Sequence, residues 1–225
     1  MMPNVEHSPL LSRLESTVLP ESGEIPMFVY TDPEVYQLEL RKVFARSWNF
    51  LAHESEVPEP GSFVVRDLGE QSVIVGRGDD NTVRVFLNSC RHRGMKLACE
   101  DFGTVDNWRC PYHGFTYGSK GEFLGTLLGA PFEKKAYPQG LDKSQLSLIE
   151  ARCESYQGLI FATWNLKGPS LREYLGDVAW YLDLLVGRAE MEVVGGPQKW
   201  IVPTGWKLPS DNFTSDAYHT ATAHS

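Results

Sequence analysis

Residues 90–94 read Cys-Arg-His-Arg-Gly, and residues 110–114 read Cys-Pro-Tyr-His-Gly. Each stretch offers one thiolate and one imidazole from a short segment that ends in glycine, and 17 residues separate His92 from Cys110. Two cysteines and two histidines in paired loops are a donor set that can hold a metal centre. We therefore expect a metal centre here, and the order of the ligands indicates its kind.

The spacing of the ligands distinguishes a zinc site from an iron–sulfur cluster. A structural zinc site usually takes its first pair from Cys-x2-4-Cys, so that two sulfurs converge from one knuckle. Here the first pair is Cys90 and His92, which is too tight for that knuckle, and both pairs have cysteine before histidine. This order favours a two-iron, two-sulfide cluster in which each loop gives its cysteine to one iron and its histidine to the other. A Cys2His2 zinc module stays open as the alternative.

The charge of such a cluster indicates its use. Two ferric ions, two sulfides, two thiolates and two neutral imidazoles sum to about zero, whereas four thiolates leave about two negative charges. An electron adds more easily to the neutral cluster, so its reduction potential is higher than that of an all-cysteine cluster. Arg91, Arg93 and Lys96, beside the first loop, would favour the reduced form further.

Composition places the chain among globular proteins. It has 225 residues and a formal net charge of −8, which argues against nucleic acid as a partner. No apolar run is long enough to span a bilayer, and Met1–Glu15 lacks the pattern of a secretory signal. We expect a cytoplasmic protein with no membrane partner, in which Cys99 and Cys153 are buried thiols.

Apolar periodicity predicts the secondary structure. Asp32 and Pro33 predict a helix start, and a period of two from about residue 60 predicts a β domain. Both ligand stretches then lie at strand ends, where a rigid sheet can position them. Ser170 and Glu173 form a capping-box pattern that predicts a helix up to about Arg188. The other expected elements are strands near 63–67, 73–75, 82–88, 147–154, 159–164 and 199–202, and a helix over 213–225.

A second group of candidate ligands, Asp216, His219 and His224, lies near the end of the chain. On a regular helix the two imidazoles would lie roughly 140° apart, so they meet at one ion only if the helix bulges or breaks between them. Asp216 and His219 are three residues apart and would share a helix face, which lets the carboxylate orient the imidazole. Taken alone this pattern is weak, because two histidines are more often surface or core residues than ligands.

Together, the two groups resemble the large (alpha) subunits of Rieske non-haem iron aromatic ring-hydroxylating dioxygenases. The paired Cys-His stretches look like the Rieske motif, and the Asp-x2-His-x4-His string is similar to the mononuclear iron site of that family. The resemblance runs from the helix at Pro33 to His224 and is strongest to the naphthalene, biphenyl and polycyclic-arene dioxygenases. The residues that approach the second site also match: Trp206-Lys207, Asp211-Asn212-Phe213 and Asp216-Ala217-Tyr218-His219.

The resemblance implies a role for each candidate residue. It implies that a [2Fe-2S] cluster is held by Cys90, His92, Cys110 and His113, and that a ferrous ion is held by His219 and His224. It also implies that Asp216 is the carboxylate that bridges the two centres, and that Asn212 and Phe213 lie near the substrate pocket.

The chain departs from the family pattern in two places. Gly205 stands where the family often has asparagine, which we expect to affect packing only. A 2-His-1-carboxylate site also needs a third ligand, and the family supplies that carboxylate from much later in the chain. We therefore expect this chain to be the N-terminal part of a longer protein and to be inactive alone.

The fold implied is α+β, with a β-sheet Rieske domain at residues 45–165 inserted in an α+β catalytic domain that is truncated here. Residues 1–44 and 166–225 would be the two parts of that catalytic domain. The implied reaction is the dihydroxylation of an aromatic ring by O2, with electrons from NAD(P)H delivered through a ferredoxin and/or a reductase. The implied assembly is a trimer of large subunits with small beta subunits (α3β3).

Two other functions stay open. A Rieske monooxygenase or demethylase would use the same two centres. A plain Rieske electron-transfer protein would need only residues 45–165 and would leave the match at 206–225 without a reason.

Overall fold

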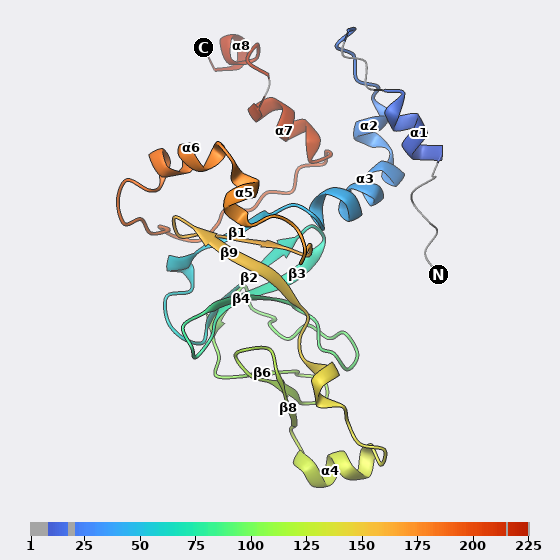
Figure 1. Ribbon diagram of the computed structural model, residues 1–225, viewed down its shortest axis with the longest axis vertical. Helices are drawn as coiled ribbons and strands as arrows, with labels where there is room; N and C mark the ends of the chain where they lie inside the picture. Colours follow the sequence, from blue (N-terminus) through green and yellow to red (C-terminus); the bar gives the residue numbers. More distant parts are fainter. Residues whose placement is uncertain (1–8, 18–20, 215, 225) are drawn as a thin grey trace. The chain divides into compact units, whose positions relative to one another are not determined.

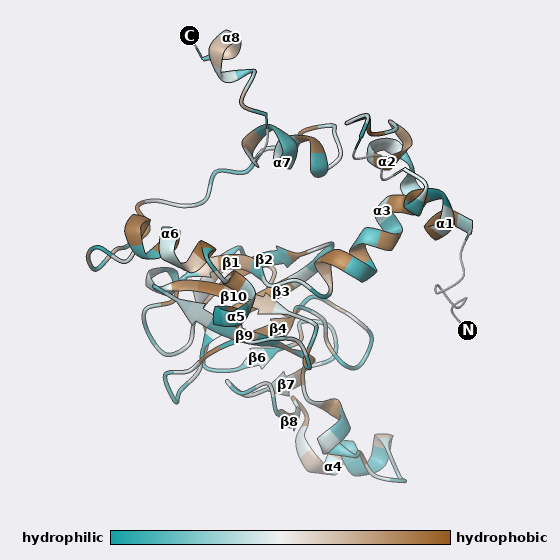
Figure 2. Ribbon diagram, turned by 45° about the horizontal axis from the view of Figure 1, so that its top comes forward, coloured by the Kyte–Doolittle hydropathy of each residue, from teal (hydrophilic) through white to brown (hydrophobic). Residues whose placement is uncertain are grey.

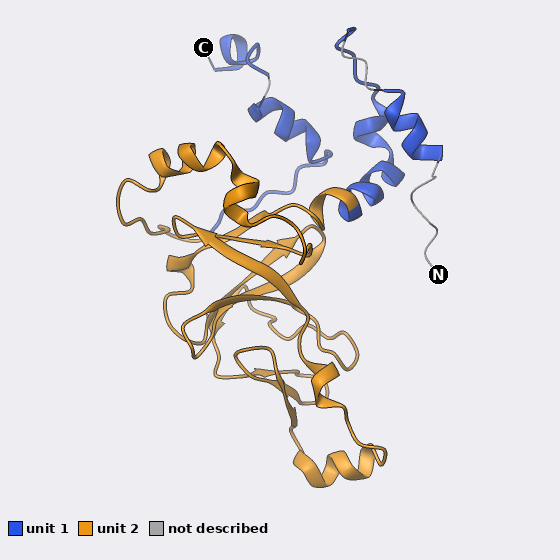
Figure 3. Cartoon of the chain, in the orientation of Figure 1, with its two compact units in different colours: residues 1–41, 197–225 blue, residues 42–196 orange. Residues whose placement is uncertain are grey.

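The computed structural model describes residues 9–17, 21–214 and 216–224, and the chain forms two compact units (Figure 3). One unit is the continuous segment 42–196, and the other takes its residues from 1–41 and 197–225. The first unit therefore interrupts the second in sequence. This confirms the predicted α+β fold class, in which a β domain is inserted into another domain.

The inserted unit contains two antiparallel sheets (Figure 1). The larger sheet has the strand order β1-β10-β9-β4-β3-β2-β5, and the smaller has the order β6-β7-β8. The strands predicted near 63–67, 73–75, 82–88, 147–154 and 159–164 are confirmed. The strands are β1 (Asn49–His53), β2 (Ser62–Leu68), β3 (Gln71–Arg77), β4 (Val83–Leu87), β5 (Phe102–Thr104), β6 (Trp108–Arg109), β7 (Phe115–Tyr117), β8 (Phe123–Thr126), β9 (Glu150–Tyr156) and β10 (Leu159–Thr163).

Strand β3 separates two apolar clusters. Successive side chains of a strand point to opposite faces. Val73 and Val75 accordingly pack in one cluster, whereas Ile74 packs in the other, and all three are fully buried. The run Val73-Ile74-Val75 is therefore continuous rather than alternating, because both of its faces are covered. Figure 2 shows apolar segments, in brown, within the strands of this unit. The cluster that holds Ile74 also holds Cys90 and Cys110, so the sheet core extends directly to the candidate ligands.

Short helices complete this unit. They are η3 (Glu54–Glu56), α4 (Gly129–Ala136), η4 (Lys143–Leu146), α5 (Leu171–Leu175) and α6 (Val178–Leu185). The capping box of Ser170 and Glu173 is present at the start of α5. The prediction of one helix up to Arg188 is wrong, because α5 ends at Gly176, whose φ of +50° turns the chain out of the helix.

The other unit is helical. Its helices are α1 (Pro9–Glu15), α2 (Phe28–Thr31), α3 (Pro33–Glu39), α7 (Lys207–Thr214) and α8 (Thr220–Ala223), and α3 continues into the π-helix η2 (Leu40–Phe44). The predicted helix start is confirmed: the Asp32 side chain accepts a hydrogen bond from the Glu34 N–H at 2.9 Å, and Pro33 is the first helical residue.

Two predicted elements near the end of the chain are wrong. Residues 199–202 form no strand, and Trp200, Ile201 and Val202 are exposed there, since β propensity without a neighbouring strand does not make a sheet. The single helix predicted over 213–225 is instead α7 and α8, separated by a turn at 216–219; residues 215 and 225 lie outside the described residues.

The two cysteines outside the ligand loops differ in exposure. Cys99 is exposed and Cys153 is half-buried, so the expectation of two buried thiols is wrong for Cys99, which lies in the loop between β4 and β5.

No helix in the described part of the chain has both the length and the apolar character needed to cross a membrane. The inserted unit includes α5 and α6, whereas the predicted boundary at residue 165 assigns them to the catalytic domain; that three-part division stays a prediction.

Candidate metal centres

The two ligand loops share one backbone hydrogen-bond pattern. In each loop the cysteine carbonyl accepts a bond from the glycine N–H four residues later, at 2.9 Å in 90–94 and 3.0 Å in 110–114. The cysteine N–H donates to the carbonyl five residues later, at 2.8 Å in both loops. The same closed turn therefore presents each cysteine–histidine pair, although the histidine lies one position later in the second loop.

Glycine closes both turns for a conformational reason. Gly94 and Gly114 have φ angles of +72° and +69°, in the left-handed region that other residues rarely adopt. At Gly114 space is also restricted, because a Cβ atom there would lie 2.5 Å from Cβ of Leu127. The Leu127 N–H donates to the Gly114 carbonyl at 2.9 Å, so the second loop is fixed against the segment after β8.

Asn88 joins the start of the first loop to the segment that follows the loop. It follows β4 directly and is buried. Its Oδ1 accepts from the N–H groups of Leu97 and Ala98 at 2.9 and 3.0 Å, and its Nδ2 donates to the Ala98 carbonyl at 2.8 Å. This residue was not predicted from the sequence. A polar residue at the end of an apolar strand, two positions before a ligand, could have indicated it.

The four predicted cluster ligands lie in two loops that meet at their histidines. Cys90 and Cys110 are buried, His92 is half-buried and His113 is exposed, and the two imidazole centroids lie 4.7 Å apart. His92 also stacks on Phe115 at 4.6 Å, which fixes the orientation of its ring. Its Nδ1 is buried and has no hydrogen-bond partner among the described residues. Because such a nitrogen is costly to bury unpaired, it fits a role as a metal ligand, as does the set of two thiols and two imidazoles.

Tyr117 is a fully buried neighbour of the first thiol. Its hydroxyl oxygen lies 3.2 Å from Sγ of Cys90 and accepts a bond from the Arg91 N–H at 3.0 Å. The hydroxyl proton is therefore available to donate to the sulfur. This role of Tyr117 was not predicted from the sequence either; its position in the strand that leaves the second loop could have indicated a neighbour of the ligands.

Local electrostatics set the protonation of these groups. Burial, and next the hydrogen bond to Cys90, raise the pKa of Tyr117 strongly, so it stays a hydrogen-bond donor. Burial chiefly also raises the pKa of the Cys90 thiol, which makes the free thiolate unfavourable without a cation. Burial, and then the nearby His113 and Arg93, lower the pKa of His92 and favour the neutral imidazole that binds metals.

A hollow of about 550 Å³ lies beside the second loop. It is lined by His92 and His113 and by apolar side chains from α4 and from the segment that precedes it, including Leu127, Leu128 and Phe132. These three side chains are exposed. The histidine side of the centre is thus its accessible side, whereas the cysteine side faces the sheet core.

The C-terminal candidate residues line a second hollow, of about 390 Å³. His219 and His224 lie at the two ends of α8, and their ring centroids are 5.2 Å apart. The expected break between the two histidines is not present, because the four residues between them are helical and the helix begins and ends at the histidines themselves. The predicted residues that line this hollow are Asn212, Phe213, Asp216, His219 and His224.

Asp216 contacts His219 differently from the expectation. The two residues do not share a helix face, because Asp216 lies in the turn before α8. Oδ1 of Asp216 accepts from the N–H groups of Tyr218 and His219 at 3.1 and 3.3 Å and stabilises that turn. The nearest acceptor of His219 Nδ1 is the Asp216 carbonyl at 2.5 Å, and Oδ2 of the carboxylate is 3.4 Å away.

Among the described residues, no group of three or more histidine, cysteine, aspartate or glutamate side chains is arranged to hold a single metal ion. The C-terminal hollow brings two imidazoles together beside Asp216. The ligand roles in both centres therefore stay predictions, supported by the geometry above.

Comparisons with known proteins identify the first centre. Residues 47–133 match the family described as the Rieske [2Fe-2S] domain. The chain therefore contains a Rieske [2Fe-2S] domain, and this match favours the iron–sulfur cluster over the zinc alternative. The chain is also 41% identical, over 90% of its length, to the biphenyl dioxygenase alpha subunit of Paraburkholderia xenovorans, of which it covers 45%.

Two further relatives extend the similarity beyond the Rieske domain. The crystal structure of naphthalene 1,2-dioxygenase from a Rhodococcus species superposes with a TM-score of 0.88 at 40% identity, covering 96% of this chain and 50% of that one. An N,N-dimethyl phenylurea N-demethylase alpha subunit of a Sphingobium species is 43% identical over 91% of this chain and 44% of its own length. The chain thus spans about half the length of the curated relatives it matches.

Proposed function

We propose that this chain is part of the terminal oxygenase of an aromatic ring-hydroxylating system, which adds both atoms of O2 to an aromatic substrate. One observation carries the proposal: a Rieske loop pair and a two-histidine hollow occur in one chain that matches naphthalene 1,2-dioxygenase over 96% of its length. A plain electron-transfer protein would not need the residues beyond the Rieske domain.

In this proposal a bound [2Fe-2S] cluster would supply the transfer of one electron at a time. Cys90 and Cys110 would hold its inner side against the sheet core, and Tyr117 would donate a hydrogen bond to the sulfur of Cys90. His92 and His113 would hold its outer side, where His113 is exposed. Electrons would therefore enter and leave through the histidine side, because that side alone reaches the surface of this unit.

The C-terminal hollow is the proposed site of the oxygenation. When bound there, a ferrous ion would supply the binding and activation of O2. His219 and His224 would hold the ion, and Asn212 and Phe213 would form part of the wall against the substrate. Asp216 would hold His219 through its carbonyl and leave Oδ2 of its carboxylate for a donor from the other centre.

The names of the relatives support an assembly of several kinds of subunit, because they print 'subunit alpha'. We propose an α3β3 trimer in which the Rieske centre of one chain would serve the iron site of its neighbour. The proposed electron source is NAD(P)H, through a ferredoxin and/or a reductase, which places the reaction in the cytoplasm.

A demethylase is the second candidate function. It is favoured by the 43% identity to the N,N-dimethyl phenylurea N-demethylase subunit, a value as high as that to the dioxygenases. Both functions use the same two centres and differ in the substrate and in how many oxygen atoms the substrate keeps.

The products distinguish the two functions. The full-length protein, supplied with its reductase and NADH, should convert naphthalene or biphenyl into a dihydrodiol that carries two atoms from isotopically labelled O2. Release of formaldehyde from N,N-dimethyl phenylurea, with no dihydrodiol from either arene, would establish the demethylase instead. Reoxidation of the cluster without either product would contradict both.

A further inference from the structure

Tyr30 and Asp211 are joined across 181 positions of the sequence. The Tyr30 hydroxyl, in α2, donates to Oδ2 of Asp211, in α7, at 2.5 Å. This hydrogen bond, and next desolvation, raise the pKa of Tyr30, so the hydroxyl keeps its proton at neutral pH. The contact lies wholly within the unit that carries the C-terminal hollow.

The bond to Asp211 continues to the candidate iron ligands. Asp211 directly precedes Asn212 and Phe213, which line the hollow. The Asp211 carbonyl accepts from the Asp216 N–H at 3.1 Å, and the Asp216 carbonyl lies 2.5 Å from Nδ1 of His219. A series of hydrogen bonds therefore runs from Tyr30 to His219 along the backbone of the turn after α7.

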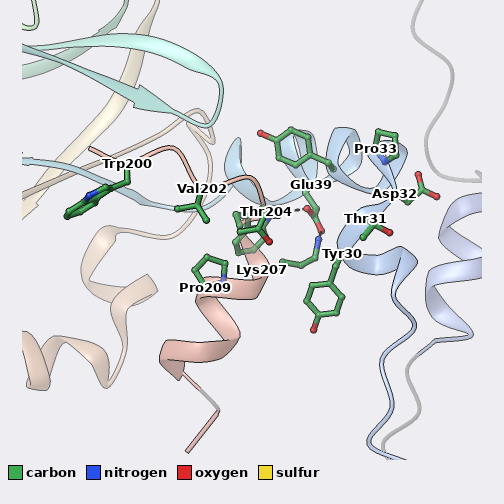
Figure 4. Close-up of a pocket in the computed structure, with 13 residues that line it drawn as sticks. Tyr30, Thr31, Asp32, Pro33, Glu39, Trp200, Val202, Thr204, Lys207 and Pro209 are labelled. Carbon is green, nitrogen blue, oxygen red and sulfur yellow. Dashed lines mark hydrogen bonds and ion pairs between the residues drawn. The ribbon is translucent and has the colours of Figure 1, made fainter. Parts of the chain in front are cut away.

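A second contact fixes the start of the same helix. Glu39 of α3 accepts from Nε1 of Trp206 at 2.8 Å and pairs with the ammonium group of Lys207. Figure 4 shows Glu39 and Lys207 pointing toward one another, with Tyr30 nearby. Lys207 and Asp211 are four residues apart on α7, so both anchors lie on one face of the helix.

Apolar packing does not hold α7 in place in the described part of the chain. None of its residues is buried, and neither is any residue of α2. The anchoring contacts border a cavity of about 470 Å³, which Tyr30, Glu39, Trp206 and Lys207 help to line (Figure 4). Hydrogen bonds to charged groups are stronger than those between neutral groups, so these contacts restrain α7 against the N-terminal helices.

We propose that Tyr30 is a positioning residue for the mononuclear iron site, acting through Asp211 on the turn that carries Asp216 and His219. The proposal rests on the proposed function of that site. Tyr30 touches neither the iron ligands nor the substrate wall, and its role is to keep the turn in one arrangement. Positioning of this kind has a large effect, because a displacement of about 1 Å can cost on the order of a hundredfold in rate.

The test uses Tyr30→Phe in the full-length protein, because this change removes only the hydroxyl. We expect an unchanged cluster, a roughly tenfold lower kcat with KM within about twofold, and an altered electron paramagnetic resonance spectrum of the nitric oxide adduct of the ferrous ion. Asp211→Asn keeps an acceptor oxygen for Tyr30 and should retain most of the parent rate, whereas Asp211→Ala should match Tyr30→Phe. Tyr181→Phe, at an exposed position on α6, is the control and should change nothing.

The outcomes are distinguishable. If Tyr30→Phe and Asp211→Ala keep the parent kcat and the parent nitrosyl spectrum, Tyr30 has no positioning role. If Asp211→Asn loses as much as Asp211→Ala, the hydrogen bond from Tyr30 is not what matters, and the proposal is overturned as well. If the parent forms no product from any substrate, the proposed function fails, but the nitrosyl spectrum still decides the role of Tyr30. A parent protein that binds no ferrous ion contradicts both.

Discussion

The hydroxyl oxygen of Tyr117 lies 3.2 Å from Sγ of Cys90 while it accepts a hydrogen bond from the Arg91 N–H. The Arg91 N–H occupies one lone pair of this oxygen, so the oxygen acts as the acceptor in that bond and its own proton can point to the sulfur. A hydrogen bond to a ligand sulfur stabilises the more negative, reduced cluster and so raises its reduction potential. Tyr117 therefore links the sheet core to the redox property of the centre.

Tyr117→Phe should lower the reduction potential of the cluster. The ring still fills its buried position, so the loss is mainly that of the hydrogen bond. A decrease of about 59 mV corresponds to a tenfold change in a one-electron equilibrium, and we expect a decrease of that order. A redox titration followed by electron paramagnetic resonance measures it, with Tyr181→Phe as the control. An unchanged potential in Tyr117→Phe would show that the hydroxyl does not donate to the sulfur.

Gly114→Ala and Gly94→Ala form a matched pair. Both changes force a side chain into a left-handed conformation, at a cost of about 1–3 kcal/mol. Only at Gly114 does the new Cβ also collide with Leu127; at Gly94 the nearest atom, Oγ of Ser89, is 3.7 Å away. We expect Gly114→Ala to lose more iron and sulfide per chain, and to have a lower Tm, than Gly94→Ala. Equal losses would mean that contact with Leu127 does not restrict the second loop.

The pH dependence of stability should show that the ionised carboxylate of Glu133 stabilises the fold. Its carboxylate accepts from the Thr126 N–H at 2.6 Å and lies 3.6 Å from the Lys143 ammonium. The Thr126 bond chiefly, and then Lys143, lower the pKa of Glu133 below its usual range despite its burial. A group whose folded-state pKa is lowered stabilises the fold above its unfolded pKa of about 4.3, and this contribution disappears as the pH falls through the folded pKa.

Glu133→Gln should accordingly lower Tm at pH 7, and the difference from the parent should shrink as the pH is lowered below about 4. Circular dichroism of both proteins over this range measures the difference, and Glu190→Gln, at an exposed glutamate, is the control. A Tm difference that stays constant down to the lowest pH would show that the charge of Glu133 is not responsible.

Substitutions at Asp216 separate its two contacts. Asp216→Asn keeps an oxygen that can accept from Tyr218 and His219, whereas Asp216→Ala removes that cap, worth about 1 kcal/mol. If the carboxylate charge bridges the two centres, both variants should keep a reducible cluster and bound iron but lose nearly all product formation. Single turnover of the pre-reduced full-length protein with substrate and O2 measures this. An Asn variant that reoxidises and forms product at the parent rate would remove the bridging role.

The sequence was sufficient for features that depend on local pattern. Alternation predicted the strand near 63–67, and a short apolar run predicted the strand at Val73–Val75. The paired spacing of cysteine and histidine identified both ligand loops. The helix after Ser170 was predicted as one element from its capping box, which marks where a helix starts but does not reveal that Gly176 adopts a positive φ and ends it. Exposure of Cys99 likewise depends on where the loop between β4 and β5 lies in the fold and not on the neighbours of Cys99 in the sequence.

Contacts between distant residues were not predictable in this way. Tyr117 meets Cys90 across 27 positions and Tyr30 meets Asp211 across 181, and nothing in one chain marks such pairs. The approach of His219 to His224 was expected only if the helix broke between them, whereas the structure brings them together at the two ends of α8.

The composition of the centre formed by Cys90, His92, Cys110 and His113 is the most direct test of the central claim. Protein purified without oxygen should contain two irons and two acid-labile sulfides per chain and should give an electron paramagnetic resonance signal after one-electron reduction. His113→Cys should retain a cluster whose potential is lower, because a thiolate adds negative charge. A colourless protein with one zinc ion and no sulfide would contradict the assignment.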